Sequence, residues 1–474
     1  MQHFLSKKQK LCRKESALNM EVGVIIKLLR CQRSPSKGYT MKIAMSSFSG
    51  MGAWWVLRLL AEGHDVDYYL SKHEYEDVLG GLIPAPKKLS LDHRRSVAGY
   101  GYPSYKGYDL SLFDLTGVPK QADASAMDAP TIGDGHLNHM LEDDREAGIQ
   151  AMEESGIEVP PWQKFTSISE AKAFLKKNDK RYVYKPFEGY GVDDKSLTYV
   201  AKSAEDLLSC IDKLFSMSRQ APFLLQEFIK GTEASCMGYF NGEDFYLLTS
   251  TLEDKKFMDG DKGPNTGASG NLVFAIKETS KLYTQGLKKA APLLKKIGYR
   301  GMIDLNAIVT QDKLYGLEWT PRFGYIADSC IALMYGKGFG EMLQRIAIGK
   351  APVLKWDAPF VVGITVSIPP YPTEIRIPKA KDIPVKGIDP EDIEQLCSMY
   401  LYDVKLSKDK KSLVTSGNYG YIGAPMGIGE SIGEAATACN KLVEKLEVPN
   451  MQHRTDTEKS VSKRYNFLMD NSWL

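Results

Sequence analysis

Residues 300–324, RGMIDLNAIVTQDKLYGLEWTPRFG, restrict the fold of this 474-residue chain more than any other stretch. Side chains alternate with a period of two on both sides of a turn near Asp312, which predicts the two strands of a β-hairpin. Four polar side chains of the pair would then share one face as cross-strand or diagonal neighbours: Asp304, Asn306, Glu318 and Thr320.

Two carboxylates so close together repel each other unless a cation lies between them. Mg²⁺ held by Asp304 and Glu318 together with nucleotide phosphates would remove that repulsion. A sheet face neutralised by ordinary salt bridges is the alternative. In the nucleotide interpretation, Arg322 becomes a candidate clamp for a transferring phosphoryl group or an acyl phosphate.

A second stretch, DGDKGPNTGASG at residues 259–270, contains four glycines and one proline. Glycine and proline remove side-chain packing and ladder donors, so we predict a loop here rather than a helix or a central strand. A long surface turn is the simplest interpretation. The charged run at 253–256 just before it keeps a ligand-binding loop open as the alternative.

From His136 onward, helical and strand patterns alternate with short connections, which predicts one compact αβ unit. Within it, a strand turns on Gly189 and Gly191, with Lys185 before the turn. Such a turn could place backbone N–H groups and a cation over phosphates. Taken alone, Lys185 is better explained as a solvated lysine at a strand end.

The sequence from Met41 to Leu70 reads as strand, glycine-containing turn, helix and strand, the opening of a parallel-sheet domain. Residues 1–40 differ from the rest, with nine Lys or Arg against two Glu. That bias fits a targeting extension or a translation start set too far upstream, and we favour the second.

Composition excludes several classes of partner. The chain has 61 basic and 59 acidic residues, and this near balance of charge gives no reason to expect nucleic acid or a membrane surface as a partner. Seven scattered cysteines never form a C-x-x-C pair, which argues against a disulfide scaffold or structural zinc. No apolar run is long enough to span a bilayer. We expect a reduced, cytoplasmic setting.

Three motifs follow one another in order: LQEFIKGTE at 225–233, DGDKGPNTG at 259–267 and LEWTPRFG at 317–324. In this order and spacing they resemble the ATP-grasp ligases, and more narrowly the glycinamide ribonucleotide synthetase (phosphoribosylamine–glycine ligase) family. The resemblance runs from Met41 to about residue 455. It includes a late strand pair and helix at 411–446 that are similar to the family's C-terminal domain.

The resemblance implies a multidomain α/β and α+β fold. A basic extension (1–40) would precede an N-terminal parallel-sheet domain (41–135), an ATP-grasp domain (136–355) and a small C-terminal α+β domain (356–455). The tail at 456–474 matches nothing in the family.

The resemblance also implies an ADP-forming ligase that uses ATP with Mg²⁺ or Mn²⁺ to activate glycine as an acyl phosphate and joins it to phosphoribosylamine. The residues implied for nucleotide binding are Arg145, Lys185, Gly189, Gly191, Glu227, Phe228, Ile229 and Glu233. Those implied for the metal are Glu318, Asp304 and Thr320. Those implied for catalysis are Arg322, Asp261, Asn265 and Lys255, and for substrate binding Lys256, Thr266 and Gly267.

The chain also departs from the family. Thr320 stands where the metal motif has an asparagine, and Asp304 offers a compensating acid. In the first domain, SGMGAWW and FDLTGVPKQAD replace motifs that help the family bind the phosphoribosyl substrate. Another amine acceptor therefore remains an alternative, with Trp54 and Trp55 either stacking that acceptor or packing in the core. A non-catalytic nucleotide-binding relative is the third interpretation.

Overall fold

The computed structural model describes residues 39–89, 105–114, 128–133, 135–187, 197–373 and 380–474. Gly189 and Gly191, predicted to turn over phosphates, lie outside the described residues, as does the extension at 1–38. In the described part of the chain, every helix is too short or too polar to span a bilayer.

The N-terminal unit is a five-stranded parallel sheet in the order β3-β2-β1-β4-β5, as predicted. The strands are β1 (Lys42–Ser47), β2 (Asp65–Leu70), β3 (Lys87–Lys88), β4 (Leu110–Phe113) and β5 (Thr131–Ile132). Helix α3 (Ala53–Ala61) is buried from Ala53 to Leu60, because its sequence is apolar on every side except at Arg58. A short 3₁₀ turn, η1 (His73–Tyr75), follows β2.

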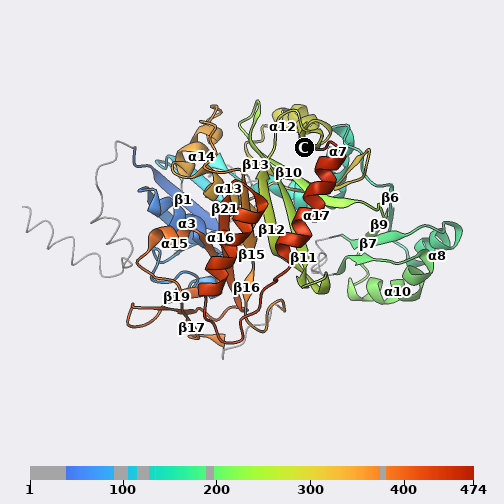
Figure 1. Cartoon of the computed structure of the whole chain (residues 1–474). Coiled ribbons are helices and arrows are strands. Elements are labelled where there is room, and N and C mark those ends of the chain that lie inside the picture. Colours follow the sequence, from blue (N-terminus) through green and yellow to red (C-terminus); the bar gives the residue numbers. More distant parts are fainter. Residues whose placement is uncertain (1–38, 90–104, 115–127, 134, 188–196, 374–379) are drawn as a thin grey trace, which may run out of the picture.

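A small antiparallel sheet in the order β6-β9-β7-β8 forms a separate lobe beside the main body of the molecule (Figure 1). Its elements are β6 (Trp162–Phe165), α8 (Ile168–Lys177), β7 (Tyr182–Pro186), β8 (Tyr199–Val200), α10 (Ala204–Met217) and β9 (Phe223–Glu227). The lobe has its own apolar cluster, in which Phe223 contacts Phe165 and Tyr184. This lobe therefore folds around a core that is distinct from the main one.

A long antiparallel sheet in the order β14-β13-β10-β11-β12-β15-β21-β16 occupies the centre, with β18 also paired to β21. Its strands are β10 (Thr232–Phe240), β11 (Phe245–Met258), β12 (Lys262–Ala275), β13 (Gly301–Val309), β14 (Leu314–Thr320), β15 (Phe360–Ile364), β16 (Val366–Ser367), β18 (Met399–Leu401) and β21 (Tyr421–Gly429). The sheet is continuous across residue 355, where we predicted a domain boundary; the boundaries themselves stay a prediction.

A three-stranded sheet and further helices complete the described part of the chain. The sheet is β17 (Pro384–Val385), β20 (Leu413–Thr415) and β19 (Val404–Leu406). The helices are α6 (Gly135–Asn138), η2 (His139–Asp143, a π-helix), α7 (Arg145–Glu154), α11 (Lys281–Gln285), η3 (Leu287–Ala290), α12 (Ala291–Ile297), α13 (Tyr325–Tyr335), α14 (Phe339–Ala347), α15 (Ile393–Cys397), α16 (Ile432–Lys445) and α17 (Thr457–Asp470).

The loop predicted at 259–270 is wrong for most of its length. Only residues 259–261 form a turn, where Gly260 and Asp261 have positive φ, and residues 262–270 belong to β12. The glycines and Pro264 are tolerated because β12 pairs with β15 only from Gly270 to Phe274. Up to Ser269 the described structure gives β12 no strand partner on its outer side, so a missing donor there breaks no ladder.

The tail after residue 456, to which the sequence assigned no structure, is helix α17. It packs on β11 and β12, where it lies across the hairpin in Figure 1. Trp473 just beyond the helix is fully buried, and its indole Nε1 donates to the carbonyl of Thr310, 3.0 Å away. The C-terminal end is thus part of the core.

Candidate functional site

The β13–β14 hairpin forms as predicted, with Asp304 opposite Thr320 and Asn306 opposite Glu318. The Asn306 amide donates to Thr320 Oγ1 at 3.3 Å and lies 3.5 Å from Asp304 Oδ2. The four polar side chains therefore share one face of the sheet, as the period of two indicated.

Carboxylates from four neighbouring strands gather at this face. Burial and the nearby Glu253 carboxylate raise the pKa of Asp304 well above its ordinary value. Burial, together with Glu233 and Glu318, also raises the pKa of Glu253, although Lys255 opposes the shift. Asp304 Oδ1 is buried and has no hydrogen-bond partner among the described residues. Such crowding of acids fits a cation-binding site.

The described residues alone do not supply a complete metal cage. No group of three His, Cys, Asp or Glu side chains within the described ranges has an arrangement that would hold a metal ion. One or two carboxylates are enough when nucleotide phosphates and water provide the remaining oxygens, as is usual for Mg²⁺. The acids on β13 and β14 fit that second kind of site.

Three cations face these acids. The Lys255 ammonium forms an ion pair with Glu233, and although burial opposes it, Glu233, Glu253 and Glu318 raise the pKa of Lys255. Lys185 lies on β7 of the small lobe. Burial, and then the Arg145 guanidinium, lower the pKa of Lys185 to about 8. Arg145 begins α7, so the helix, the lobe and the central sheet each contribute a cation to one place.

Arg322 is held at the start of the segment that leads into α13. Its Nη2 donates to Glu142 Oε1 at 2.8 Å, and its guanidinium lies 5.3 Å from the ring centre of Tyr325. Although burial opposes it, Glu142 raises the pKa of Arg322, so the side chain stays charged. The guanidinium is 15% exposed, which leaves it a fixed cation with a small accessible face.

The strand-end residues of β9 lie where the small lobe joins the central sheet. Glu227 is paired with Lys180 at 2.8 Å, and the Arg181 guanidinium lies 3.5 Å from the ring centre of Phe228. The Phe228 backbone N–H donates to the Arg181 carbonyl. Phe228 and Ile229 are half-buried. The connection between the small lobe and the central sheet is therefore ordered by contacts that leave part of its surface accessible.

The remaining predicted residues lie on the β11–β12 hairpin. Asn265 lies opposite Lys256, and the Thr266 hydroxyl donates to the Lys255 carbonyl at 3.1 Å. Gly267 is exposed, and no described atom lies within 4 Å of where a Cβ would stand. Asp261 is at the turn, exposed and paired with Arg454. These residues line one arm that projects from the sheet.

A buried acid just after β4 binds the β1–α3 turn. Asp114 accepts from Ser47 Oγ at 2.6 Å and from the Phe48 N–H at 3.2 Å, and burial raises the pKa of Asp114 to about 6. Ser47 Oγ in turn accepts from the N–H groups of Gly50 and Gly52. Backbone donors of this turn are therefore satisfied by the protein itself.

Trp54 and Trp55 pack in the core and do not form a stacking platform. Both are at most 1% exposed, and the Trp55 ring lies 4.8 Å from Phe323 and 5.5 Å from Phe339 between ring centres. They join α3 to the elements that follow the β13–β14 hairpin.

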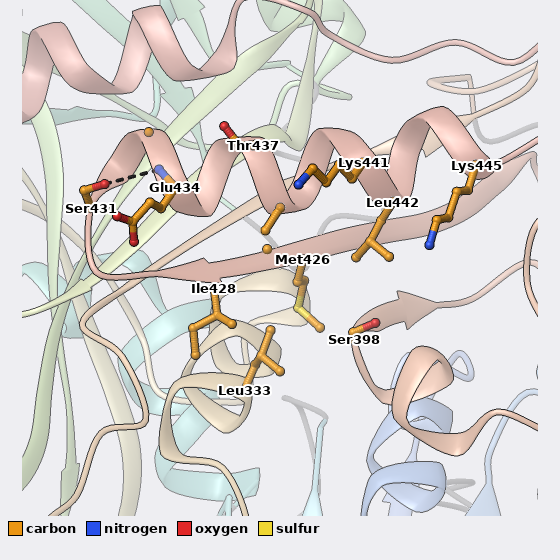
Figure 2. A pocket seen from close by; sticks show the side chains of 13 residues that line it. Leu333, Ser398, Met426, Ile428, Ser431, Glu434, Thr437, Lys441, Leu442 and Lys445 are labelled. Carbon is orange, nitrogen blue, oxygen red and sulfur yellow. Dashed lines mark hydrogen bonds between the residues drawn. The ribbon is translucent and has the colours of Figure 1, made fainter.

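One hollow of about 810 Å³ lies along α16 and β21 (Figure 2). Its lining includes Leu333, Met426 and Lys441, and none of the residues predicted for the site lines it. The described residues that were predicted for the site therefore lie away from this hollow.

Sequence reasoning missed several residues of the site. Glu253 was seen only as part of a charged run, although a period of two would have placed it beside Lys255 on one face. Glu142, Asp114 and Arg454 carried no local signal, because their partners lie 180, 67 and 193 residues away.

Comparison with known proteins agrees with this architecture. Residues 148–327 match the family described as phosphoribosylglycinamide synthetase, ATP-grasp (A) domain. This part of the chain is thus similar to an ATP-grasp domain. That match covers the small lobe and the β10–β14 part of the central sheet, where the charged face is built.

Several relatives of this chain are phosphoribosylamine–glycine ligases. That of Streptococcus pneumoniae is 24% identical over 335 residues, covering 67% of this chain and 75% of the relative. That of Caldanaerobacter subterraneus is 25% identical over 328 residues, covering 67% and 76%. The phosphoribosylamine–glycine ligase structure from Thermotoga maritima superposes with a TM-score of 0.67 at 20% identity, over 88% of this chain and 99% of that one. Biotin carboxylase from Campylobacter jejuni superposes with a TM-score of 0.60 at 14% identity, over 91% and 97%.

Proposed function

We propose that this protein is an ADP-forming carboxylate–amine ligase that activates glycine with ATP and joins it to 5-phosphoribosylamine, a step of purine biosynthesis. The observation that carries the proposal is the charged face, where cations from three elements meet carboxylates from four strands. The similarity to phosphoribosylamine–glycine ligases selects the reaction.

The nucleotide would lie between the small lobe and the central sheet. Lys185 and Arg145 would contact its phosphates. Glu227, Phe228 and Ile229 would contact the adenine edge, and Glu233 would accept from ribose hydroxyls. Because Glu233 is now paired with Lys255, nucleotide binding would release that lysine toward the phosphates.

Glu318 would hold Mg²⁺ or Mn²⁺ together with Asp304, while Thr320 could contribute only a neutral hydroxyl. The unpartnered Asp304 Oδ1 and the raised pKa of this carboxyl fit such a role. A bound divalent ion would neutralise charge on the phosphates during transfer.

The chemistry has two steps. A carboxylate oxygen of glycine attacks the γ-phosphorus, the bond to the bridging oxygen breaks, and ADP leaves. The amine then attacks the acyl carbon, inorganic phosphate leaves, and the amine loses a proton. Arg322 and Lys255 would face the developing negative charge. Lys256, Asn265, Thr266 and Gly267 would hold the amino acid, because acyl phosphates survive only where both reactants are fixed and water is excluded.

A second candidate acceptor is favoured by the β1–α3 turn. Asp114 and Ser47 take up the N–H groups of Phe48, Gly50 and Gly52, donors that a phosphate would need. A buried carboxyl at this place suits an uncharged or cationic amine better than a phosphorylated one. The alternative is therefore a ligase that joins an amino acid to a different amine.

The test is mass spectrometry of products from purified protein with Mg-ATP and glycine, with and without fresh phosphoribosylamine. Glycinamide ribonucleotide formed only when phosphoribosylamine is present supports the proposal. Glycine-dependent ADP release without that product favours another amine, and a panel of phosphate-free amines then replaces the acceptor. No turnover with any amino acid would leave the non-catalytic interpretation. We expect small-molecule substrates and a cytoplasmic setting, with no nucleic acid.

A further inference from the structure

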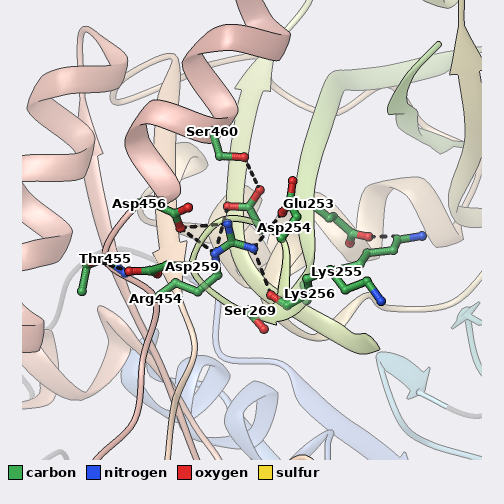
Figure 3. Close-up of polar contacts among 12 residues, drawn as sticks. Glu253, Asp254, Lys255, Lys256, Asp259, Ser269, Arg454, Thr455, Asp456 and Ser460 are labelled. Carbon is green, nitrogen blue, oxygen red and sulfur yellow. Dashed lines mark hydrogen bonds and ion pairs between the residues drawn. The ribbon is translucent and has the colours of Figure 1, made fainter. Parts of the chain in front are cut away.

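The C-terminal segment from Arg454 to Arg464 binds the tip of the β11–β12 hairpin. We define this tip as residues 253–262. Arg454 is only 1% exposed although its guanidinium is charged (Figure 3). A buried arginine persists only where carboxylates and carbonyls satisfy its donors. Its partners lie about 200 residues earlier in the chain, on the hairpin.

Arg454 Nη1 donates to the Lys256 carbonyl at 2.9 Å and to Asp261 Oδ1 at 3.1 Å. Its Nε donates to Asp456 Oδ1 at 2.8 Å and lies 3.8 Å from Asp254 Oδ2. One guanidinium thus ties β11, the turn and the C-terminal segment together.

The neighbours of Arg454 add contacts along the same tip. The Thr455 N–H and hydroxyl both donate to the Asp259 carboxylate, at 2.9 and 2.5 Å. Asp456 Oδ2 accepts from the Gly260 N–H at 2.8 Å. Every residue of the three-residue turn is therefore bound by the C-terminal segment.

Helix α17 holds the strand behind the turn. Arg464 Nη2 donates to Asp254 Oδ1 at 2.5 Å, and its Nη1 donates to the Glu253 carbonyl at 2.8 Å. The Ser460 hydroxyl donates to Asp254 at 2.7 Å. Asp254 is buried, so its charge depends on these donors.

Because side chains alternate along a strand, the contacts to Asp254 also determine where Glu253 and Lys255 point. Asp254 lies on the side of β11 that faces the C-terminal segment, so Glu253 and Lys255 point to the opposite side, toward Glu233. A shift of the strand by one residue would exchange the two sets of side chains. Holding Asp254 therefore fixes Lys255 at the charged face.

We propose that the segment Arg454–Arg464 is a clamp that positions the catalytic hairpin, with Arg454 as its main positioning residue. The inference rests on the proposed function for the role of Lys255, Asn265 and Thr266. It assigns Asp259 and Asp261 to anchoring: the Asp261 side chain is 71% exposed, and its described ion-pair partner is Arg454. Sequence analysis had placed Asp261 among the catalytic residues.

Amide hydrogen exchange on the full-length protein tests the clamp without any substrate. Arg454→Gln should accelerate exchange in residues 255–268 on the order of tenfold and leave β13 and β14 unchanged. The matched control is Arg345→Gln, because Arg345 on α14 is exposed and donates to the Ala351 carbonyl far from the hairpin in sequence. Unchanged exchange at the tip in Arg454→Gln overturns the proposal, whatever the enzyme's substrate proves to be.

Kinetics separate positioning from general stability. A loosened hairpin should raise KM for glycine about tenfold or more and raise KM for ATP less, because Lys255 is the one hairpin residue assigned to the phosphates. Arg454→Lys, which keeps the charge, should recover part of the loss. If Arg454→Gln does not fold, Thr455→Val removes one hydroxyl donor to Asp259 and should give a smaller effect of the same kind. Equal changes in both KM values, or none in any folded variant, would reject the clamp even if ligase activity is confirmed.

Discussion

The pH dependence of nucleotide binding tests the environment of Lys185. Burial and the Arg145 cation lower the pKa of this ammonium to about 8, below the ordinary value for lysine. Nucleotide phosphates favour the charged form, so ATP binds the protonated lysine. Below pH 8 the proton is already present, whereas above pH 8 binding must be accompanied by proton uptake.

The magnitude follows from that single pKa. The apparent Kd scales as 1 + 10^(pH − 8), so ATP should bind about tenfold more weakly at pH 9 than at pH 7. Complexation should take up about 0.9 proton at pH 9 and about 0.1 proton at pH 7. Both quantities come from calorimetry with a non-hydrolysable ATP analogue and Mg²⁺, in buffers of different ionisation enthalpy at fixed ionic strength.

Lys185→Arg is the matched control, because an arginine stays charged through this range and should remove the slope. A flat profile in the unmodified protein would refute the reasoning. So would an equally steep profile in Lys185→Arg, since another group would then be responsible.

Three further predictions address other parts of the account. Glu318→Ala should abolish Mg-ATP turnover while circular dichroism and the unfolding midpoint stay close to those of the parent; retained turnover would exclude Glu318 as metal ligand. Arg322→Ala should lower kcat far more than ATP affinity. Glu142→Gln removes the carboxylate partner of Arg322 but keeps the guanidinium, so it should lower kcat less. A loss of ATP affinity alone in Arg322→Ala would count against a transition-state role. Trp55→Ala should lower the free energy of unfolding by about 3–5 kcal/mol in urea titrations, because the ring is buried against Phe323 and Phe339; a loss below about 1 kcal/mol would contradict the packing described.

The parts of the fold predicted from sequence are those with a strong local period. The β13–β14 hairpin and its face of polar side chains follow from alternation alone, whereas the pairing of Asp304 with Thr320 comes from the structure. The parallel sheet of the first domain follows from its strand, glycine turn and helix at 41–70.

The loop prediction at 259–270 failed because the rule against proline and glycine in strands holds for central strands only. Pro264 and the glycines after it argue against a central strand, but this part of β12 projects beyond β15 and needs no second partner. The clamp was invisible for another reason. Arg454 and Asp254 are joined by folding across 200 residues, and nothing near either one indicates the other.

The candidate site likewise contains residues that local spacing predicts and residues that it does not. Asp304 and Glu318 were found by spacing, whereas Lys185, Glu233 and Lys255 were placed together only through resemblance to a family. Glu142 and Asp114 were missed, because a buried acid is recognised by its partners and not by its neighbours in sequence.

Transfer of ¹⁸O from labelled glycine tests the acyl-phosphate chemistry most directly. The protein is incubated with Mg-ATP, an accepting amine and glycine whose carboxylate oxygens are both ¹⁸O, and the released phosphate is analysed by mass spectrometry. Attack of the carboxylate on the γ-phosphorus predicts one ¹⁸O in each phosphate and one retained in the amide product. Unlabelled phosphate, or release of AMP in place of ADP, would contradict the account.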